Sequence, residues 1–145
     1  MPHKPEQLRI VVGSDDAGRP YKDLLAEAMR ADGRVAEVRD VAGDVPSGAA
    51  YPDVALAAAE RIAAGRADRA LLVCHTGLGM AIAASKVPGI RAVTAHDVVS
   101  VRASVLSTDA QVLALGQGVI GLALARRLVD EWLAHRFAPG TGRGC

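Results

Sequence analysis

Short apolar runs alternate along the chain with longer segments in which apolar residues recur at helical spacing. The apolar runs are rich in Val, Leu, Ile and Ala, as is typical of buried β-strands. These predicted strands are residues 9–13, 35–38, 70–74, 90–95 and 112–115. The predicted helices are residues 21–32, 53–64, 80–86, 98–105 and 121–137. We expect the last helix to bury Leu122, Leu128, Val129, Trp132 and Leu133.

This alternation predicts repeated βαβ units. Strands that follow one another at about 25 residues, with a helix between them, form a parallel sheet covered by helices on both faces. We expect one domain over residues 1–145, with flexible tails at 1–8 and 138–145, and a loop at 42–52 because Gly and Pro break that stretch. In such sheets the functional site lies beyond the carboxyl ends of the strands.

Composition narrows the classes of function. Half of the 145 residues are hydrophobic and only 3% are aromatic, so the core must be aliphatic. The net charge of +1 gives no electrostatic footprint for nucleic acid or an anionic membrane. No apolar run approaches the roughly 20 residues that span a bilayer, and the N-terminus lacks the apolar stretch of a signal peptide. We expect neither a nucleic-acid partner nor a membrane.

The chain has two cysteines, too few for a disulfide framework. A reducing cytoplasm fits this count, and Cys74 is then expected to be a free thiol. No spacing of Cys, His and carboxylate residues suggests a metal site. We therefore expect no metal and no cofactor.

The turn after the third predicted strand carries the most chemical information. Gly77 and Gly79 let backbone N–H groups converge, and the helix that follows adds its positive end. Such a turn can hold a phosphate or a developing oxyanion, and the same field favours the thiolate of Cys74 at the strand end. A thiolate beside an anion hole suits enediol chemistry. The alternative is a tight strand-to-helix turn with a buried, inert cysteine.

Two adjacent carboxylates, Asp15 and Asp16, follow the first predicted strand. One can bind substrate hydroxyls while the other caps the next helix. Carboxylate pairs at this place also occur in phosphoacceptor receiver domains. That reading requires an aspartate where the chain has Cys74 and a lysine near Gly116 and Gln117, and both are missing.

Two histidines fall at the same predicted edge. His75 can tune the neighbouring base or touch substrate, or it can be a solvent-exposed turn residue. His96 with Asp97 can be an oriented acid–base pair, or Asp97 can simply cap the next helix. Neighbouring side chains on a strand point apart, so the cap is favoured.

At these residues the chain resembles the ribose-5-phosphate isomerase B family, which also holds galactose-6-phosphate isomerase subunits and tetrose-phosphate isomerases. The resemblance covers residues 9–137, in motifs at 13–15, 51–53, 72–74 with 76–79, 82–86, 89–92, and 112–116 with 119–121. It implies an α/β fold, a Rossmann-like three-layer α/β/α sandwich with a five-stranded parallel sheet. It also implies a homodimer or dimer of dimers, no metal, and a site shared between two subunits.

The resemblance assigns roles residue by residue. The family's thiol base falls on Cys74, and the glutamate that some relatives use instead falls on Met80. Asp15 matches the aspartate that contacts sugar hydroxyls, and Tyr51 matches a residue that lines the pocket. The anion hole falls on the backbone of Thr76, Gly77, Leu78 and Gly79.

The chain also departs from the family pattern. Asp16 replaces a phosphate-binding histidine, His75 replaces a glycine, and Ser107, beside Thr108, replaces the histidine that opens the sugar ring. The arginines of the family's C-terminal tail have no clean match. The remaining candidates for phosphate binding are Arg102, Arg136 and Arg143.

We therefore expect an aldose–ketose isomerase of a small sugar phosphate that uses Cys74 and passes through a cis-enediolate. A tetrose 4-phosphate cannot close a furanose ring and needs no ring-opening histidine, so Ser107 favours a tetrose over ribose 5-phosphate. The alternative is a catalytically altered family member, which acts on a non-standard substrate or serves as a binding or regulatory module.

Overall fold

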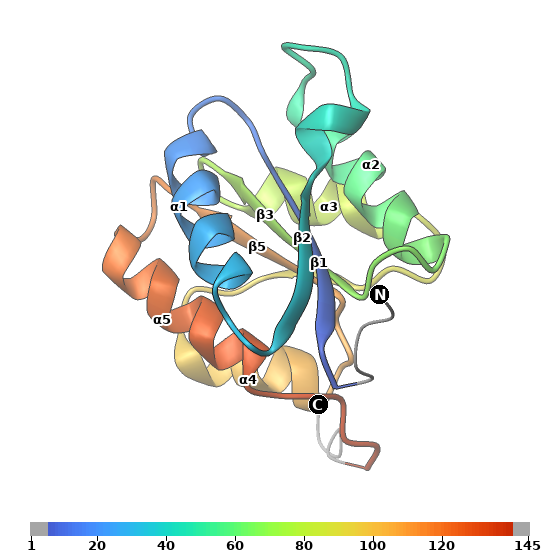
Figure 1. The fold of residues 1–145 in the computed structure, drawn as a ribbon, viewed down its shortest axis with the longest axis vertical. Helices are drawn as coiled ribbons and strands as arrows, with labels where there is room; N and C mark the ends of the chain where they lie inside the picture. The colour runs from blue at the N-terminus through green and yellow to red at the C-terminus, as the bar shows by residue number, and fades with distance from the viewer. Residues whose placement is uncertain (1–5, 141–145) are drawn as a thin grey trace.

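The computed structural model describes residues 6–140, which fold around one parallel sheet (Figure 1). Its strands are β1 (Leu8–Ser14), β2 (Val35–Asp40), β3 (Arg69–Cys74), β4 (Ala92–Thr94) and β5 (Val112–Gly116). Its helices are α1 (Arg19–Arg30), a 3₁₀ turn η1 (Val41–Asp44), α2 (Tyr51–Ala63), α3 (Leu78–Ser85), α4 (Val98–Leu106) and α5 (Leu122–Leu133). The strand order is β2-β1-β3-β5-β4, with every neighbouring pair parallel. The expected three-layer fold is confirmed.

Alternate residues of the central strands feed two separate cores, one on each face of the sheet. Val12 and Leu71 pack toward α1, α4 and α5. Val11, Leu72 and Cys74 pack toward α2 and α3. In Figure 1, α1 and α5 lie on one side of the sheet and α2 and α3 on the other. This period of two fixes which side of the sheet each strand-end side chain faces.

Two boundaries near the N-terminal half differ from expectation. Leu8, expected in a flexible tail, is the buried first residue of β1, and its N–H donates to the carbonyl of Arg34 at 2.9 Å. The stretch expected to be a loop over 42–52 contains η1, because the side chain of Asp40 accepts the N–H of Ala42 at 2.9 Å. The same stretch also holds the start of α2, at Tyr51, with a proline in the first turn. Pro is favoured there, because the first N–H groups of a helix have no partner within the helix.

Helix α5 ends at Leu133 rather than at residue 137. The buried guanidinium of Arg69 donates to the carbonyls of Trp132 and His135, both at 2.6 Å, and lies 5.5 Å from the centre of the Trp132 ring. A cation that donates hydrogen bonds to the carbonyls left without partners at a helix end favours termination of the helix there. Burial, with the nearby Arg136, lowers the pKa of Arg69 to about 10, so it remains charged at neutral pH.

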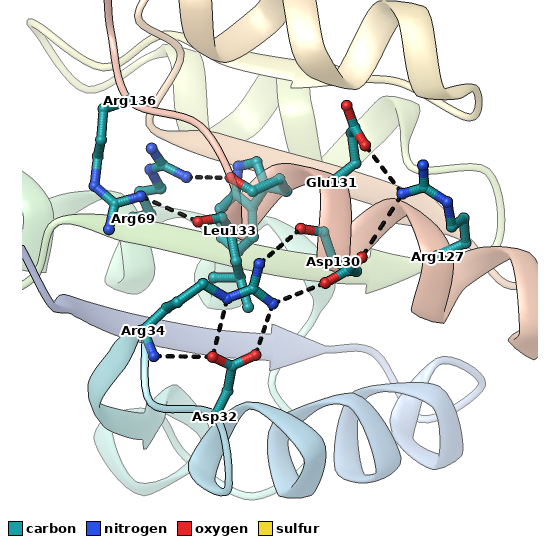
Figure 2. Close-up of polar contacts among 9 residues, drawn as sticks. Asp32, Arg34, Arg69, Arg127, Asp130, Glu131, Leu133 and Arg136 are labelled. Carbon is teal, nitrogen blue, oxygen red and sulfur yellow. Dashed lines mark hydrogen bonds and ion pairs between the residues drawn. The ribbon is translucent and has the colours of Figure 1, made fainter.

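The same edge of the sheet carries a polar network that ties α5 to the turn before β2 (Figure 2). Arg34 lies between Asp32 and Asp130, at 2.7 and 2.8 Å. Arg127 then bridges Asp130 and Glu131. This network occupies the amino-terminal edge of the sheet and leaves the opposite edge to the candidate site. Within the part of the chain that the structure describes, no helix is long and apolar enough to cross a membrane.

Candidate active site

Three strand ends meet at the carboxyl edge of the sheet. Cys74, the last residue of β3, pairs with Gly116, the last residue of β5. Asp15 directly follows β1, and its N–H donates to the carbonyl of Val73 at 3.3 Å. The chain order reverses between β1 and β3, which is where open α/β sheets form a crevice.

Cys74 lies under the turn that leads into α3. Its side chain faces the α2–α3 core and is only 7% exposed. The N–H of Gly77 donates to its sulfur at 3.1 Å, which stabilises negative charge on the thiol. Gly77 has φ +82°, and its carbonyl accepts the hydroxyl of Thr94 at 2.9 Å. A left-handed glycine therefore points one backbone donor at the Cys74 sulfur.

The backbone from Thr76 to Gly79 forms the first turn of α3, where N–H groups lack partners within the helix. The hydroxyl of Thr76 accepts the N–H of Leu78 at 3.3 Å. Gly79 lies directly against the ring of Tyr51, so a side chain there would collide with the aromatic carbons. The start of α2 is thus held against the start of α3, and both line the same edge.

The two carboxylates after β1 have different partners. Asp15 accepts the N–H of Gly18, which precedes the first residue of α1, at 2.7 Å. Asp16 is largely exposed and forms an ion pair with Arg19 at 3.0 Å. Both line a cavity of about 210 Å³, with Ser47 on the facing loop. Asp15 thus supports the turn, and the charge of Asp16 is compensated by Arg19 at the cavity wall.

The two histidines at this edge behave differently. His75 is exposed, lies over Gly118, and has its Nδ1 3.3 Å from the side-chain nitrogen of Gln117. His96 accepts the N–H of Gly116 through Nε2 at 2.8 Å. Asp97 caps α4, since it accepts the N–H of Ser100 at 2.7 Å, as the favoured alternative predicted. The hydrogen bonds from Ser100 lower the pKa of Asp97.

The remaining predicted site residues do not meet Cys74 within one chain. Ser107 ends α4, and the hydroxyl of Thr108 donates to the carbonyl of Ser104 at 2.7 Å. Because α4 starts beyond the carboxyl end of β4 and stops before β5 begins, both lie at the opposite edge of the sheet. Arg136 also lies there and donates to the backbone carbonyls of Glu6, Leu133 and His135.

Of the other two arginines proposed to bind phosphate, the structure describes only one. Arg102 is exposed on α4, whereas Arg143 lies outside the described residues. Arg102 lines an open, mainly apolar groove on this helix with Val99 and Ser107. Its guanidinium is therefore on the surface of α4 rather than at the crevice beside Cys74.

Sequence reasoning did not single out Thr94 or give His96 its role. Both follow from parallel pairing in which β4 lies beside β5, a neighbour relation that the order of the chain does not reveal. The sequence did place Thr94 and His96 at the end of the fourth predicted strand, and this position could have marked them as site residues. The buried Lys22, 2.5 Å from Asp40, was also missed, since it reads as a polar position on α1.

The site combines a thiol, converging backbone donors and a carboxylate. A sulfur base can move a proton on carbon, and N–H groups can hold the oxygen on which charge then develops. Among residues 6–140, no group of three or more His, Cys, Asp or Glu side chains could hold a metal ion.

Comparisons with known proteins agree with this geometry. The D-erythrulose-4-phosphate isomerase 2 of Mycolicibacterium smegmatis is 61% identical over 133 residues, covering 91% of this chain and 88% of that protein. The ribose-5-phosphate isomerase B of Escherichia coli is 36% identical, covering 91% and 87%. The solved structure of Clostridium thermocellum ribose-5-phosphate isomerase B is 41% identical, with a TM-score of 0.82 over 90% of this chain and 86% of that one.

The family model described as Ribose/Galactose Isomerase matches residues 10–144, which is nearly the whole chain. Relatives that cover most of both sequences agree with it, as does the solved structure in its strand and helix arrangement. This chain belongs to the ribose/galactose isomerase family.

Proposed function

We propose that the chain is an aldose–ketose isomerase of a small sugar phosphate, with Cys74 as the base that moves a proton between C1 and C2. The observation that carries this proposal is the contact between the Cys74 sulfur and the Gly77 N–H, at the positive end of α3. Met80 is fully buried and offers no alternative base in the turn. Relatives in the family are named as sugar-phosphate isomerases.

The mechanism uses few groups. The thiolate of Cys74 removes the proton from C2 of the open-chain aldose, and the electrons move onto the carbonyl oxygen as a cis-enediolate. The backbone N–H groups of Thr76 to Gly79 stabilise that charge. A proton then passes from O2 to O1 of the enediolate, and Cys74 returns its proton to C1 to give the ketose. Asp15 binds substrate hydroxyls at the other wall. Cys74 must stay a free thiol, as it is in the structure, which fits the reducing cytoplasm.

The proposed substrate is a tetrose 4-phosphate, interconverted between erythrulose and erythrose forms. Such a sugar cannot close a furanose ring, because its fourth oxygen carries the phosphate, so the reaction needs no ring-opening histidine. Ser107 occupies the position where the resemblance expects that histidine. Two relatives named as D-erythrulose-4-phosphate isomerases, at 61% and 40% identity, support the same choice.

We also propose that a second copy of the chain completes the site, as a homodimer or a dimer of dimers. Ser107 and Thr108 lie too far along α4 to join Cys74 of their own chain, so they serve the site of a partner. Helix α4 presents Val99, which is 77% exposed, beside a groove of about 360 Å³ that includes Arg102 and Ser107. A partner that covers this groove buries Val99, and Arg102 is then available for a phosphate across the interface.

Steady-state kinetics with erythrose 4-phosphate, erythrulose 4-phosphate and ribose 5-phosphate test the proposal. We expect the highest kcat/KM with the tetrose phosphates. A kcat/KM for ribose 5-phosphate that equals or exceeds the tetrose value refutes the substrate choice and leaves the isomerase chemistry in place. Failure to turn over any of these sugars refutes the reaction itself.

A further inference from the structure

His96 holds a backbone group of the neighbouring strand. Its Nε2 lies 2.8 Å from the N–H of Gly116, the last residue of β5. A backbone N–H can only donate, so Nε2 must accept and cannot carry a proton. The contact therefore requires a neutral imidazole, with its remaining ring proton on Nδ1.

Gly116 in turn supports the turn that carries Cys74. The N–H groups of the next two residues, Gln117 and Gly118, donate to the carbonyls of Cys74 and His75 at 2.8 and 2.9 Å. A side chain at Gly116 would lie only 2.7 Å from backbone atoms of Thr76, so the two backbones are in close contact. A shift of Gly116 must move the Cys74 turn, because no space separates them.

We propose that His96 is a positioning residue for the isomerase reaction, which holds the Cys74–Gly79 turn in its reactive geometry through Gly116. The inference rests on the proposed function for its kinetic consequences, but the hydrogen bond itself does not. Without the His96 acceptor, the buried N–H of Gly116 loses its partner. The strand end then relaxes and misplaces the sulfur and the N–H groups of the anion hole.

Because the hydrogen bond from Gly116 requires a neutral His96, the position of the Cys74–Gly79 turn should depend on pH. Burial lowers the pKa of His96 below 6.5, and the carboxylate of Asp97 opposes that shift. The turn packed against Gly116 carries two further ionisable side chains, Cys74 and His75. The contribution of His96 to stability is fully present above pH 6.5 and is lost as the pH falls through its lowered pKa.

Three variants separate positioning from general stability. His96→Ala removes the acceptor, and we expect kcat to fall by about tenfold or more with a smaller change in KM. His96→Gln supplies an amide oxygen in place of Nε2 and should recover most of kcat. In the parent, protonation of His96 should make kcat/KM fall more steeply at acid pH than one titrating group would. In His96→Gln this additional fall should be absent. His135→Gln, at the opposite edge beside Glu131, serves as the matched control and should behave as the parent.

Three results would count against the proposal. If kcat of folded His96→Ala equals that of the parent, or if the pH profile of His96→Gln overlays the parent profile, His96 has no positioning role. A loss of thermal stability in His96→Ala with unchanged kcat would leave only a structural role and would also refute it.

A spectroscopic measurement tests the contact without any substrate. In a ¹⁵N-labelled protein we expect the Nε2 resonance of His96 in the unprotonated range at neutral pH, with scalar coupling to the Gly116 amide and a titration midpoint below 6.5. A protonated Nε2 at neutral pH refutes the inference even if the enzyme is active. The expected spectrum together with no turnover of any sugar phosphate refutes the proposed function instead.

Discussion

Replacement of Gly77 by alanine tests the geometry of the turn that holds Cys74. Gly77 has φ +82°, which disfavours any residue with a Cβ. The added carbon would lie 3.0 Å from the Thr94 methyl group and 3.1 Å from the carbonyl oxygen of Ala114. The substitution therefore combines backbone strain with crowding against β4 and β5.

Both contributions have known magnitudes. A non-glycine residue in the left-handed region costs about 1–2 kcal/mol. Crowding in a packed interior adds about 1–3 kcal/mol. We expect Gly77→Ala to lose about 2–5 kcal/mol of unfolding free energy and about 5–20 °C of Tm. We also expect lower kcat at temperatures where the variant is folded, because the Gly77 N–H no longer points at the Cys74 sulfur.

Two other glycines provide matched controls. Gly65 also has positive φ, at +76°, but a Cβ there meets no atom within 4 Å, so Gly65→Ala bears only the backbone cost. Gly33 has neither restriction, and Gly33→Ala should be neutral or stabilise by up to about 1 kcal/mol. Urea denaturation and steady-state assays on the three variants measure both effects. If Gly77→Ala matches Gly65→Ala in stability and the parent in kcat, the proposed role of the turn is wrong.

Three further substitutions address the rest of the molecule. Arg69→Met should lower the free energy of unfolding by about 2–3 kcal/mol, because it removes both charged donors to the end of α5; an unchanged urea midpoint would contradict this. Val99→Asp should convert the proposed oligomer to a poorly active monomer in sedimentation velocity, and persistence of the parent species would exclude α4 as the interface. Ser107→His should raise kcat/KM for ribose 5-phosphate more than for erythrose 4-phosphate, whereas equal changes would remove the ring-opening argument.

The sequence was sufficient for the sheet because the strand signal is local. Short apolar runs located all five strands, and their spacing by helices implied parallel pairing. The element boundaries that were predicted wrongly depend on side-chain contacts, some of them between residues far apart in the sequence. Helix α5 stops early because Arg69, more than 60 residues before it, donates hydrogen bonds to the carbonyls at its end. Part of the expected loop forms η1 because the side chain of Asp40 caps it.

The candidate site was predictable where it follows from topology. The ends of β1 and β3 place Asp15 near Cys74, as the rule for parallel sheets implies. The link from His96 to Gly116 was not predictable, because it depends on β4 and β5 being neighbours in register. The sequence also did not predict that Ser107 and Thr108 lie at the opposite end of the strands from Cys74 of the same chain.

Deuterium exchange into the substrate carbon tests the central claim, that Cys74 moves the proton, most directly. Cys74→Ser keeps an oxygen that can accept the Gly77 N–H, so the variant should fold as the parent does by circular dichroism. With a tetrose phosphate in D₂O, we predict that NMR will show rapid loss of the C–H signal with the parent and a rate about 10²- to 10⁴-fold lower with Cys74→Ser. Exchange by folded Cys74→Ser at a rate close to the parent rate would contradict the account.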